Sequence, residues 1–152
     1  MRIVRAQPAD APILSAIAWA AKAHWGYPIS WLEQWRDQLT ITSTFIAKNE
    51  IFAAVVNGQI TGFCGLLAIG EVMRLEHLWV LPEAIGRGIG KTLFQHAAAR
   101  ARALGSACLT IEADPNAEGF YLRMGALRNG TLTIEIEGQP RELPLLTYNL
   151  SS

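Results

Sequence analysis

A glycine-rich turn near the middle of the chain constrains the fold more than any other feature. It covers residues 85–91, Ile-Gly-Arg-Gly-Ile-Gly-Lys, between a predicted strand at 73–81 and a predicted alanine-rich helix at 89–104. Its three glycines let the backbone approach a ligand closely, because no Cβ atom blocks the way. The start of the helix adds unpaired N–H groups and the positive end of the helix dipole. This combination predicts an anion cradle suited to a pyrophosphate.

Three other interpretations of this turn can be weighed from the sequence. A plain glycine-rich turn without a ligand stays open, because a strand, a Gly-x-Gly pair and a helix are weak evidence alone. A dinucleotide fingerprint needs a glycine at its sixth position, which here is Lys91 counted from Gly86 and Leu93 counted from Gly88. A Walker phosphate loop needs a glycine where this chain has Ile85. Both nucleotide motifs are therefore excluded.

The other segments predict an α/β fold, a mixed sheet with helices on both faces, in the order β-α-α-β-β-β-α-β-α-β-β. The expected strands lie at residues 2–5, 51–56, 59–68, 73–81, 107–112, 132–136 and 143–150. The expected helices lie at residues 13–23, 31–39 and 89–104, with a short one between 114 and 125. No repeat or linker interrupts this order, so a single domain over residues 1–152 is predicted.

Short local signals set some of the expected boundaries. Asp10 is an expected N-cap of the first helix. Ser30 and Glu33 have the spacing of a capping box at the start of the second helix. Asn57-Gly58 predicts a two-residue hairpin turn, and residues 138–140 predict the turn between the last two strands.

The composition indicates a globular protein and gives no sign of a nucleic-acid or membrane partner. Apolar residues make up 51% and charged residues 17% of the 152 residues, and 13 basic residues balance 13 acidic ones. No apolar run approaches the roughly 20 residues of a membrane span, and the first residues do not resemble a signal peptide. Cys64 and Cys108 lie in apolar runs, which favours buried free thiols and a cytoplasmic location. A homodimer is compatible with these features.

Two segments together resemble motifs of the GNAT superfamily of acetyl-CoA-dependent N-acyltransferases. Residues 79–91 resemble the pyrophosphate motif of that family, and residues 114–126 resemble the motif that closes its cofactor site. They lie in the family's order and at its usual separation, and the element order matches over nearly the whole chain. Ile85 replaces the usual arginine or glutamine, and Ala126 replaces a common aromatic residue. We expect altered contact to the cofactor at Ile85, with Arg87 as a substitute charge, and a packing change at Ala126.

The resemblance implies acetyl-CoA as co-substrate, with its pantetheine arm between the strands at 73–81 and 107–112. Backbone groups around Leu78 and Val80 would bind the arm, and the N–H near Val80 would hold the thioester carbonyl. One such donor is typically worth about 2.7–4 kcal/mol. No metal is expected, since the cysteines lack metal-ligand spacing. The expected cofactor-binding residues are Leu78, Val80, Ile85, Gly86, Arg87, Gly88, Ile89, Gly90, Lys91 and Asn116.

Acetyl transfer to an amine also needs a base and an acid. An amine with a pKa near 10.4 is only about 0.1% deprotonated at about pH 7.4, so help in removing its proton is worth up to roughly 4 kcal/mol. Glu76 matches a family position that often serves as base, and its alternative role is an exposed or salt-bridged strand residue. His77 is the weaker candidate, because strand alternation points it to the opposite face. Tyr121 matches the family's proton donor to the thiolate, and its alternative role is a core aromatic.

The first two predicted helices are rich in aromatic residues, and in similar proteins this region forms one wall of the acceptor pocket. The residues concerned are Trp19, His24, Trp25, Tyr27, Trp31 and Trp35. His24 and Tyr27, near the break between the helices, are the expected substrate-binding residues, and plain helix packing is the alternative. Small amines, amino acids and peptide or protein amines all stay open as acceptors.

The sequence thus predicts an N-acetyltransferase that moves an acetyl group from acetyl-CoA to a primary amine by direct attack. No serine, cysteine or histidine grouping suggests a covalent enzyme intermediate. A non-catalytic acyl-CoA-binding regulatory module is the alternative, because it keeps the cradle and needs neither base nor acid. Acylation of a hydroxyl group, or use of a longer acyl chain, is a third hypothesis.

Overall fold

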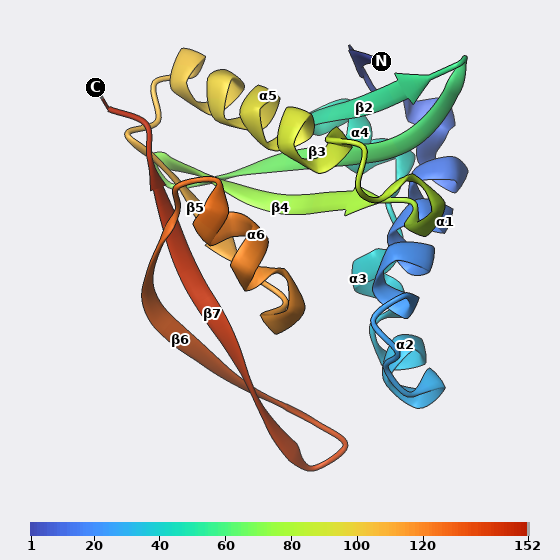
Figure 1. Ribbon diagram of the computed structural model, residues 1–152, viewed down its shortest axis with the longest axis vertical. Coiled ribbons are helices and arrows are strands. Elements are labelled where there is room, and N and C mark those ends of the chain that lie inside the picture. Colours follow the sequence, from blue (N-terminus) through green and yellow to red (C-terminus); the bar gives the residue numbers. More distant parts are fainter. Residues whose placement is uncertain (152) are drawn as a thin grey trace. The chain divides into compact units, whose positions relative to one another are not determined.

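The strands pair in the order β1-β2-β3-β4-β5-β7-β6 in the computed structural model, which describes residues 1–151 (Figure 1). They are β1 (Arg2–Arg5), β2 (Glu50–Val56), β3 (Gln59–Ile69), β4 (Val72–Val80), β5 (Cys108–Glu112), β6 (Leu127–Ile136) and β7 (Gln139–Asn149). β4 and β5 run parallel, whereas β1 with β2, β5 with β7 and β6 with β7 are antiparallel. The mixed α/β fold class is therefore confirmed.

Six α-helices and three short 3-10 turns accompany the strands in the described part of the chain. The helices are α1 (Ala11–Ala23), α2 (Ile29–Gln34), α3 (Arg36–Leu39), α4 (Ser43–Lys48), α5 (Ile89–Ala103) and α6 (Glu118–Arg123). The 3-10 turns are η1 (Pro8–Asp10), η2 (Pro82–Ala84) and η3 (Pro115–Ala117). None of the helices among residues 1–151 is long and apolar enough to cross a membrane.

The chain divides into two compact units, and β3, β4 and α5 contribute to both. The first unit holds Met1–Gly65 and His77–His96, and the second holds Leu66–Glu76 and the chain from Ala97 onward. The glycine-rich turn therefore belongs to the first unit, and the segment at 114–126 belongs to the second.

The core of the first unit is built from strand faces and one face of each long helix. β1 lies in register with β2, from Arg2 opposite Val55 to Arg5 opposite Phe52. The largest fully buried side chains of this unit are Phe63, Phe94, Leu14, Ile46, Ile51, Leu93 and Cys64. The hairpin predicted at Asn57-Gly58 is confirmed, since these residues have φ values of 51° and 77°, as a tight two-residue turn requires.

In the second unit, β5 is central and β7 lies between β5 and β6. Leu109 of β5 faces Tyr148 of β7 and is fully buried. The turn between β6 and β7 falls at Glu137-Gly138, with φ values of 52° and 77°, so the predicted turn at 138–140 is one residue too late. Positive φ at both residues makes a two-residue turn, which lets β7 begin at Gln139.

Three expectations about the helices near the N-terminus are corrected by the structure. The helix expected at 31–39 is interrupted at buried Trp35 into α2 and α3. No capping box forms at Ser30, because α2 begins at Ile29 after Pro28. Asp10 does not cap α1; its carboxylate accepts a hydrogen bond from the Gln7 N–H at 2.8 Å and closes η1 instead.

α4 is a helix that the sequence analysis missed in the polar stretch after residue 39. The Thr42 hydroxyl accepts a hydrogen bond from the Phe45 N–H at 3.0 Å, which is the standard N-cap interaction. Ile46 anchors the helix by burying its side chain. Thr42 is a typical N-cap residue, so the start of α4 could have been predicted from the sequence.

Candidate functional site

The glycine-rich turn leaves β4 through η2 and enters α5 with its backbone open to solvent. Gly86 and Gly88 have φ values of +86° and +79°, which side chains other than glycine rarely adopt. A Cβ atom added at either glycine would meet no atom within 4 Å, so both require glycine for backbone conformation and not for lack of space. Gly90, the third glycine, lies within the first turn of α5 and is half-buried.

The first turn of α5 leaves N–H groups available beside this turn. The Thr92 N–H donates to the Gly88 carbonyl at 3.1 Å, and the Thr92 hydroxyl donates to the same oxygen at 2.9 Å. The N–H groups of Ile89, Gly90 and Lys91 precede that first helical hydrogen bond, as at any helix start. Ile89 is only 3% exposed and anchors the helix end. The geometry is that of a backbone anion cradle.

The side chains around the cradle add charge but little apolar cover. Arg87 and Lys91 are exposed on either side of Ile89. Ile85, which replaces the usual polar residue of the resembling family, is 53% exposed. The structure therefore gives Ile85 no role in the core and places two exposed cations near the cradle.

Val80 ends β4 with its N–H pointing away from β3. The next residue, Leu81, donates its N–H to the Thr61 carbonyl of β3 at 2.8 Å. Successive N–H groups of a strand point to opposite edges, so the Val80 N–H faces the other edge of β4. Leu78 has the same orientation as Val80, because the two residues are two positions apart.

His77 is a packed residue of β4. It is 9% exposed, and its Nδ1 accepts a hydrogen bond from the Trp79 indole N–H at 3.0 Å. The ring centroids of Phe45 and Phe63 lie 5.7 and 5.9 Å from that of His77. This buried, aromatic setting agrees with the weaker standing that strand alternation gave His77.

Glu76 of β4 takes part in an ion-pair cluster within the second unit. Its Oε2 accepts from Arg74 Nε at 2.9 Å and lies 2.7 Å from Arg74 Nη2. Arg74 Nη1 lies 3.3 Å from Oε2 of Glu112 on β5. The side chains of Arg74, Glu76 and Glu112 are 26%, 31% and 40% exposed. The alternative role of Glu76, a salt-bridged strand residue, thus has direct support. If Glu76 also accepts the proton of the amine, it does so while paired with Arg74.

Asn116 and Tyr121 lie in the segment after β5, also in the second unit. The Asp114 Oδ1 accepts from the backbone N–H of Asn116 at 2.8 Å and from its side-chain amide at 3.0 Å. Asp114 also pairs with Arg141 at 3.4 Å. Tyr121, on α6, is 7% exposed, with its ring edge-on to Phe120 at a centroid distance of 5.2 Å. The hydrogen bonds of Asp114 thus fix the turn at residues 114–116. The burial of Tyr121 is compatible with a role in the core as well as with a catalytic one.

The aromatic residues near the helix break form a cluster around one of the chain's own amines. Tyr27 stacks on Trp31 at 5.9 Å and meets Trp35 edge-on at 5.0 Å. The Lys22 ammonium lies 5.1 Å from the Tyr27 ring centroid and 4.4 Å from that of Trp35. Lys22, which was not among the expected residues of this region, thus places its ammonium over both rings. His24 is exposed, and its ring contact is with Trp25 at 5.8 Å.

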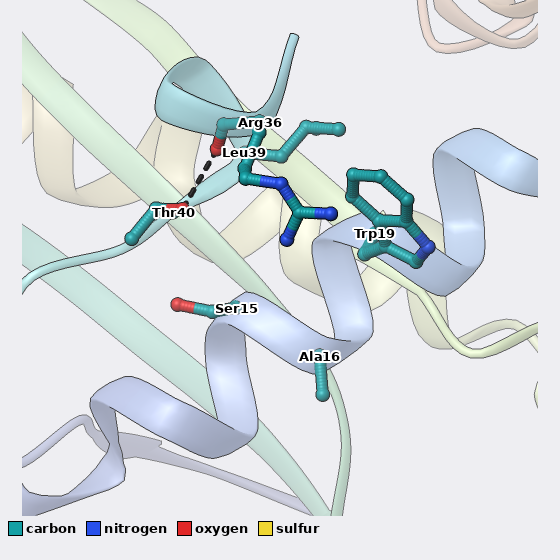
Figure 2. A pocket seen from close by; sticks show the side chains of 6 residues that line it. All are labelled: Ser15, Ala16, Trp19, Arg36, Leu39 and Thr40. Atoms are coloured by element: carbon teal, nitrogen blue, oxygen red, sulfur yellow. Dashed lines mark hydrogen bonds between the residues drawn. The ribbon is translucent and has the colours of Figure 1, made fainter. Parts of the chain in front are cut away.

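A shallow hollow of about 430 Å³ lies between α1 and α3 (Figure 2). Its lining residues are Ser15, Ala16, Trp19, Arg36, Leu39 and Thr40. The polar groups there are engaged within the chain: Arg36 makes a two-nitrogen contact with Glu33, and the Thr40 hydroxyl donates to the Arg36 carbonyl at 2.7 Å. The Arg36 guanidinium also covers the Trp19 ring at 4.7 Å. None of the expected catalytic, cofactor-binding or substrate-binding residues lines this hollow.

Among residues 1–151, no group of three or more His, Cys, Asp or Glu side chains is arranged to hold a metal ion. Both cysteines of the described chain are free thiols. Cys64 is buried, and burial raises the pKa of its thiol to about 12. Cys108 is half-buried.

Comparison with known sequences places this geometry among acetyltransferases. The model of the acetyltransferase (GNAT) family matches residues 14–126, a range that contains both motifs quoted above. The peptidyl-lysine N-acetyltransferase YjaB of Salmonella typhimurium strain LT2 is 32% identical over 109 residues, 71% of each chain. The peptidyl-lysine N-acetyltransferase YiaC of Escherichia coli strain K12 is 28% identical over 95 residues, 62% of each chain. The match thus spans under two thirds of the length of YiaC.

Solved structures agree with the fold. A GCN5-related N-acetyltransferase from Rhodopseudomonas palustris superposes with a TM-score of 0.83 at 24% identity, covering 98% of this chain and 95% of that one. The PaiA N-acetyltransferase from Thermoplasma acidophilum, solved in complex with coenzyme A, has a TM-score of 0.76 at 19% identity, covering 97% and 98%. At these identities the likeness concerns the fold.

Proposed function

Because the chain belongs to the acetyltransferase (GNAT) family, we propose that it transfers an acetyl group from acetyl-CoA to a primary amine. Membership confirms the resemblance inferred from the two motifs, and with it the acyltransferase class. The observation that carries the proposal is the exposed backbone at Gly86 and Gly88, held open by positive φ at the start of α5. The comparisons give no support to a non-catalytic acyl-CoA-binding module.

The cradle is proposed to hold the pyrophosphate of acetyl-CoA. The N–H groups of Ile89, Gly90 and Lys91 would donate to its oxygens, and the side chains of Arg87 and Lys91 would balance its charge. The Val80 N–H would donate to the thioester carbonyl oxygen, where negative charge develops as the amine attacks. The bound co-substrate supplies an activated acetyl group, and the protein supplies position and charge. A further proposed contact to the cofactor arm is Asn116.

Glu76 and Tyr121 are proposed as base and acid. Glu76 has one carboxylate oxygen, Oε2, on Arg74, while within residues 1–151 nothing donates to Oε1. That oxygen would accept the amine's proton, directly or through water. The Tyr121 hydroxyl would donate a proton to the departing thiolate. General acid–base steps of this kind typically contribute about 10²–10⁴-fold each to the rate.

The proposed acceptor is the side-chain amine of a peptide lysine. Both curated relatives described above are peptidyl-lysine N-acetyltransferases. His24 and Tyr27 are the proposed acceptor contacts, on the wall that already carries an ammonium over aromatic rings. Two free thiols support a reducing, cytoplasmic location for this reaction.

The test combines binding with turnover. Calorimetry with coenzyme A should show binding, and acetyl-CoA with a lysine peptide should release free thiol faster than the same peptide with its lysine blocked. A small amine and a peptide with only a free N-terminus complete the acceptor panel. Tyr121→Phe should lower kcat by about 100-fold or more while coenzyme A binding persists. Absence of heat with coenzyme A would overturn the whole proposal, and an unchanged kcat in Tyr121→Phe would overturn the acid assignment alone.

A further inference from the structure

The ion-pair cluster on β4 and β5 is asymmetric in a way that bears on the proposed base. Arg74 and Glu76 are two positions apart on β4 and therefore project from the same face. Arg74 lies opposite Thr110 in the parallel register, which brings Glu112, two positions further along β5, onto that face as well. Arg74 contacts both carboxylates at once, at 2.7 Å to Glu76 and 3.3 Å to Glu112.

The two contacts from Arg74 to Glu76 converge on one oxygen. Nε and Nη2 both approach Oε2, so the guanidinium fork fixes that oxygen from two directions. Two charged donors restrict the position of this one oxygen more than a single donor does. Nη1, the remaining nitrogen of Arg74, reaches Glu112 and so tethers the arginine itself to β5. The other carboxylate oxygen of Glu76, Oε1, accepts no hydrogen bond within residues 1–151, so its lone pairs are available.

We propose that Arg74 is a positioning residue that orients Glu76, with Glu112 as its anchor, so that Oε1 receives the proton of the acceptor amine. This inference rests on the proposed function. The cluster holds one cation and two carboxylates, and its net negative charge favours an acceptor that arrives as an ammonium ion. The structure thus assigns the cluster to cationic amines, such as lysine side chains, over neutral or anionic acceptors.

The proton and bond changes balance without a further reactant. One N–H proton of the acceptor ammonium passes to Glu76 Oε1, which frees the nitrogen lone pair to form the C–N bond. The C–S bond of the thioester breaks, and the thiolate takes the Tyr121 proton. The second N–H proton lost on amide formation and the proton on Glu76 leave to solvent or return to Tyr121. Arg74 stays protonated throughout and touches no reacting atom.

A structural role alone predicts a different result. Partly exposed ion pairs contribute about 0–1 kcal/mol to stability. If Arg74 only tied β4 to β5, its replacement would therefore leave kcat nearly unchanged. A positioning Arg74 has a large effect on kcat, because misplacing a catalytic group by about 1 Å can cost about 100-fold. The difference between the two roles is therefore measurable.

The experiment is a double-mutant cycle on kcat with a lysine peptide. Arg74→Gln should lower kcat by about 10- to 100-fold and leave the KM for acetyl-CoA unchanged. Arg74→Lys should recover part of the loss, and Glu112→Gln, the matched control, should lower kcat less than Arg74→Gln. Adding Arg74→Gln to Glu76→Gln should cause little further loss, because Arg74 acts through Glu76.

The outcomes separate this proposal from the proposed function. Losses that multiply in the double variant, or an Arg74→Gln enzyme with normal kcat, would overturn the positioning role while a working wild-type enzyme keeps the function. A Glu76→Gln enzyme with normal kcat would overturn both the base and its positioning residue. If the wild-type protein released no thiol from acetyl-CoA with any amine, the proposed function would be overturned, and this inference with it. Thermal unfolding of each variant checks that it is folded before its kcat is compared.

Discussion

Two regions of the first unit use glycine for opposite reasons. In β3, Gly62 and Gly65 are surrounded: an added Cβ would lie 2.8 Å from the Trp79 carbonyl oxygen at Gly62 and 2.9 Å from the Ile51 Cδ1 at Gly65. In the turn before α5, Gly86 and Gly88 are surrounded by nothing within 4 Å but have positive φ. The strand glycines are needed because tertiary packing leaves no room, and the turn glycines because the local backbone conformation excludes a side chain.

The difference separates residues that hold the fold from residues that form the proposed site. Substitution in the packed strand should disturb stability first and binding only through it. Substitution in the open turn should disturb coenzyme A binding with a small effect on stability. Each prediction below tests one side of this contrast.

The largest effect is expected for Gly62→Ala. Its Cβ would collide with a backbone oxygen of β4, which cannot rotate away as a side chain can. Overpacking of this kind costs about 1–3 kcal/mol, and at the upper end the Tm falls by roughly 6–12 °C for a chain of this size. Thermal or urea unfolding measures it. Gly65→Ala, which meets the tip of a side chain, should cost less; an equal or larger loss at Gly65 would contradict the distinction between backbone and side-chain obstacles.

The next effect is expected for Gly88→Ala, in binding. The substitution should weaken coenzyme A binding about 10-fold, because the turn must distort to relieve a positive φ and the N–H groups then lose their alignment. Calorimetry gives the Kd, and unfolding gives the accompanying stability loss of about 1 kcal/mol.

The hairpin supplies the matched control for Gly88. Gly58 has a φ of +77°, close to the +79° of Gly88, and an added Cβ there also meets nothing within 4 Å. Gly58→Ala should therefore show the same stability loss with an unchanged Kd. Equal weakening of coenzyme A binding by both variants would mean that the turn before α5 has no special part in it.

The smallest effect is expected from Cys64, which lies between the two strand glycines. Burial raises the pKa of its thiol from 9.0 to about 12, so the unfolded chain loses this proton at a lower pH than the folded chain does. The unfolded state then binds fewer protons, and stability falls as pH rises above about 9, by on the order of 1 kcal/mol between pH 8 and pH 10. Urea unfolding across this range measures the slope, and Cys64→Ala should flatten it. An identical slope in both proteins would show that Cys64 is not shielded by the packed strand.

Most strands and the hairpin could be predicted because their signals are local. The alternation that places Glu76 and His77 on opposite faces is a property of one strand. The break at Trp35 could not be predicted, since it depends on how that buried side chain packs with Tyr27, Trp31 and Lys22 once the chain has folded. The helix at Ser43–Lys48 was predictable from Thr42 but was hidden by a polar composition.

The candidate site divides in the same way. The glycine-rich turn could be predicted, because the glycines that permit a positive φ and the start of the helix are adjacent in the sequence. The pairing of Glu76 with Arg74 follows from strand alternation, because the two residues are two positions apart on β4. The second contact of Arg74, with Glu112, depends on the register of β5, which no short segment encodes. Lys22 was missed because its position over Tyr27 depends on how the chain reverses after α1.

The Lys22 contact has a consequence for selectivity at this wall. An acceptor ammonium that approaches Tyr27 and Trp35 meets the Lys22 ammonium, which is held there by the same chain. Tethering gives that cation a high effective concentration, so a free amine offering only its charge competes poorly. If Tyr27 contacts the acceptor as proposed, amines carried by a longer chain, which make further contacts of their own, should be preferred over small free amines.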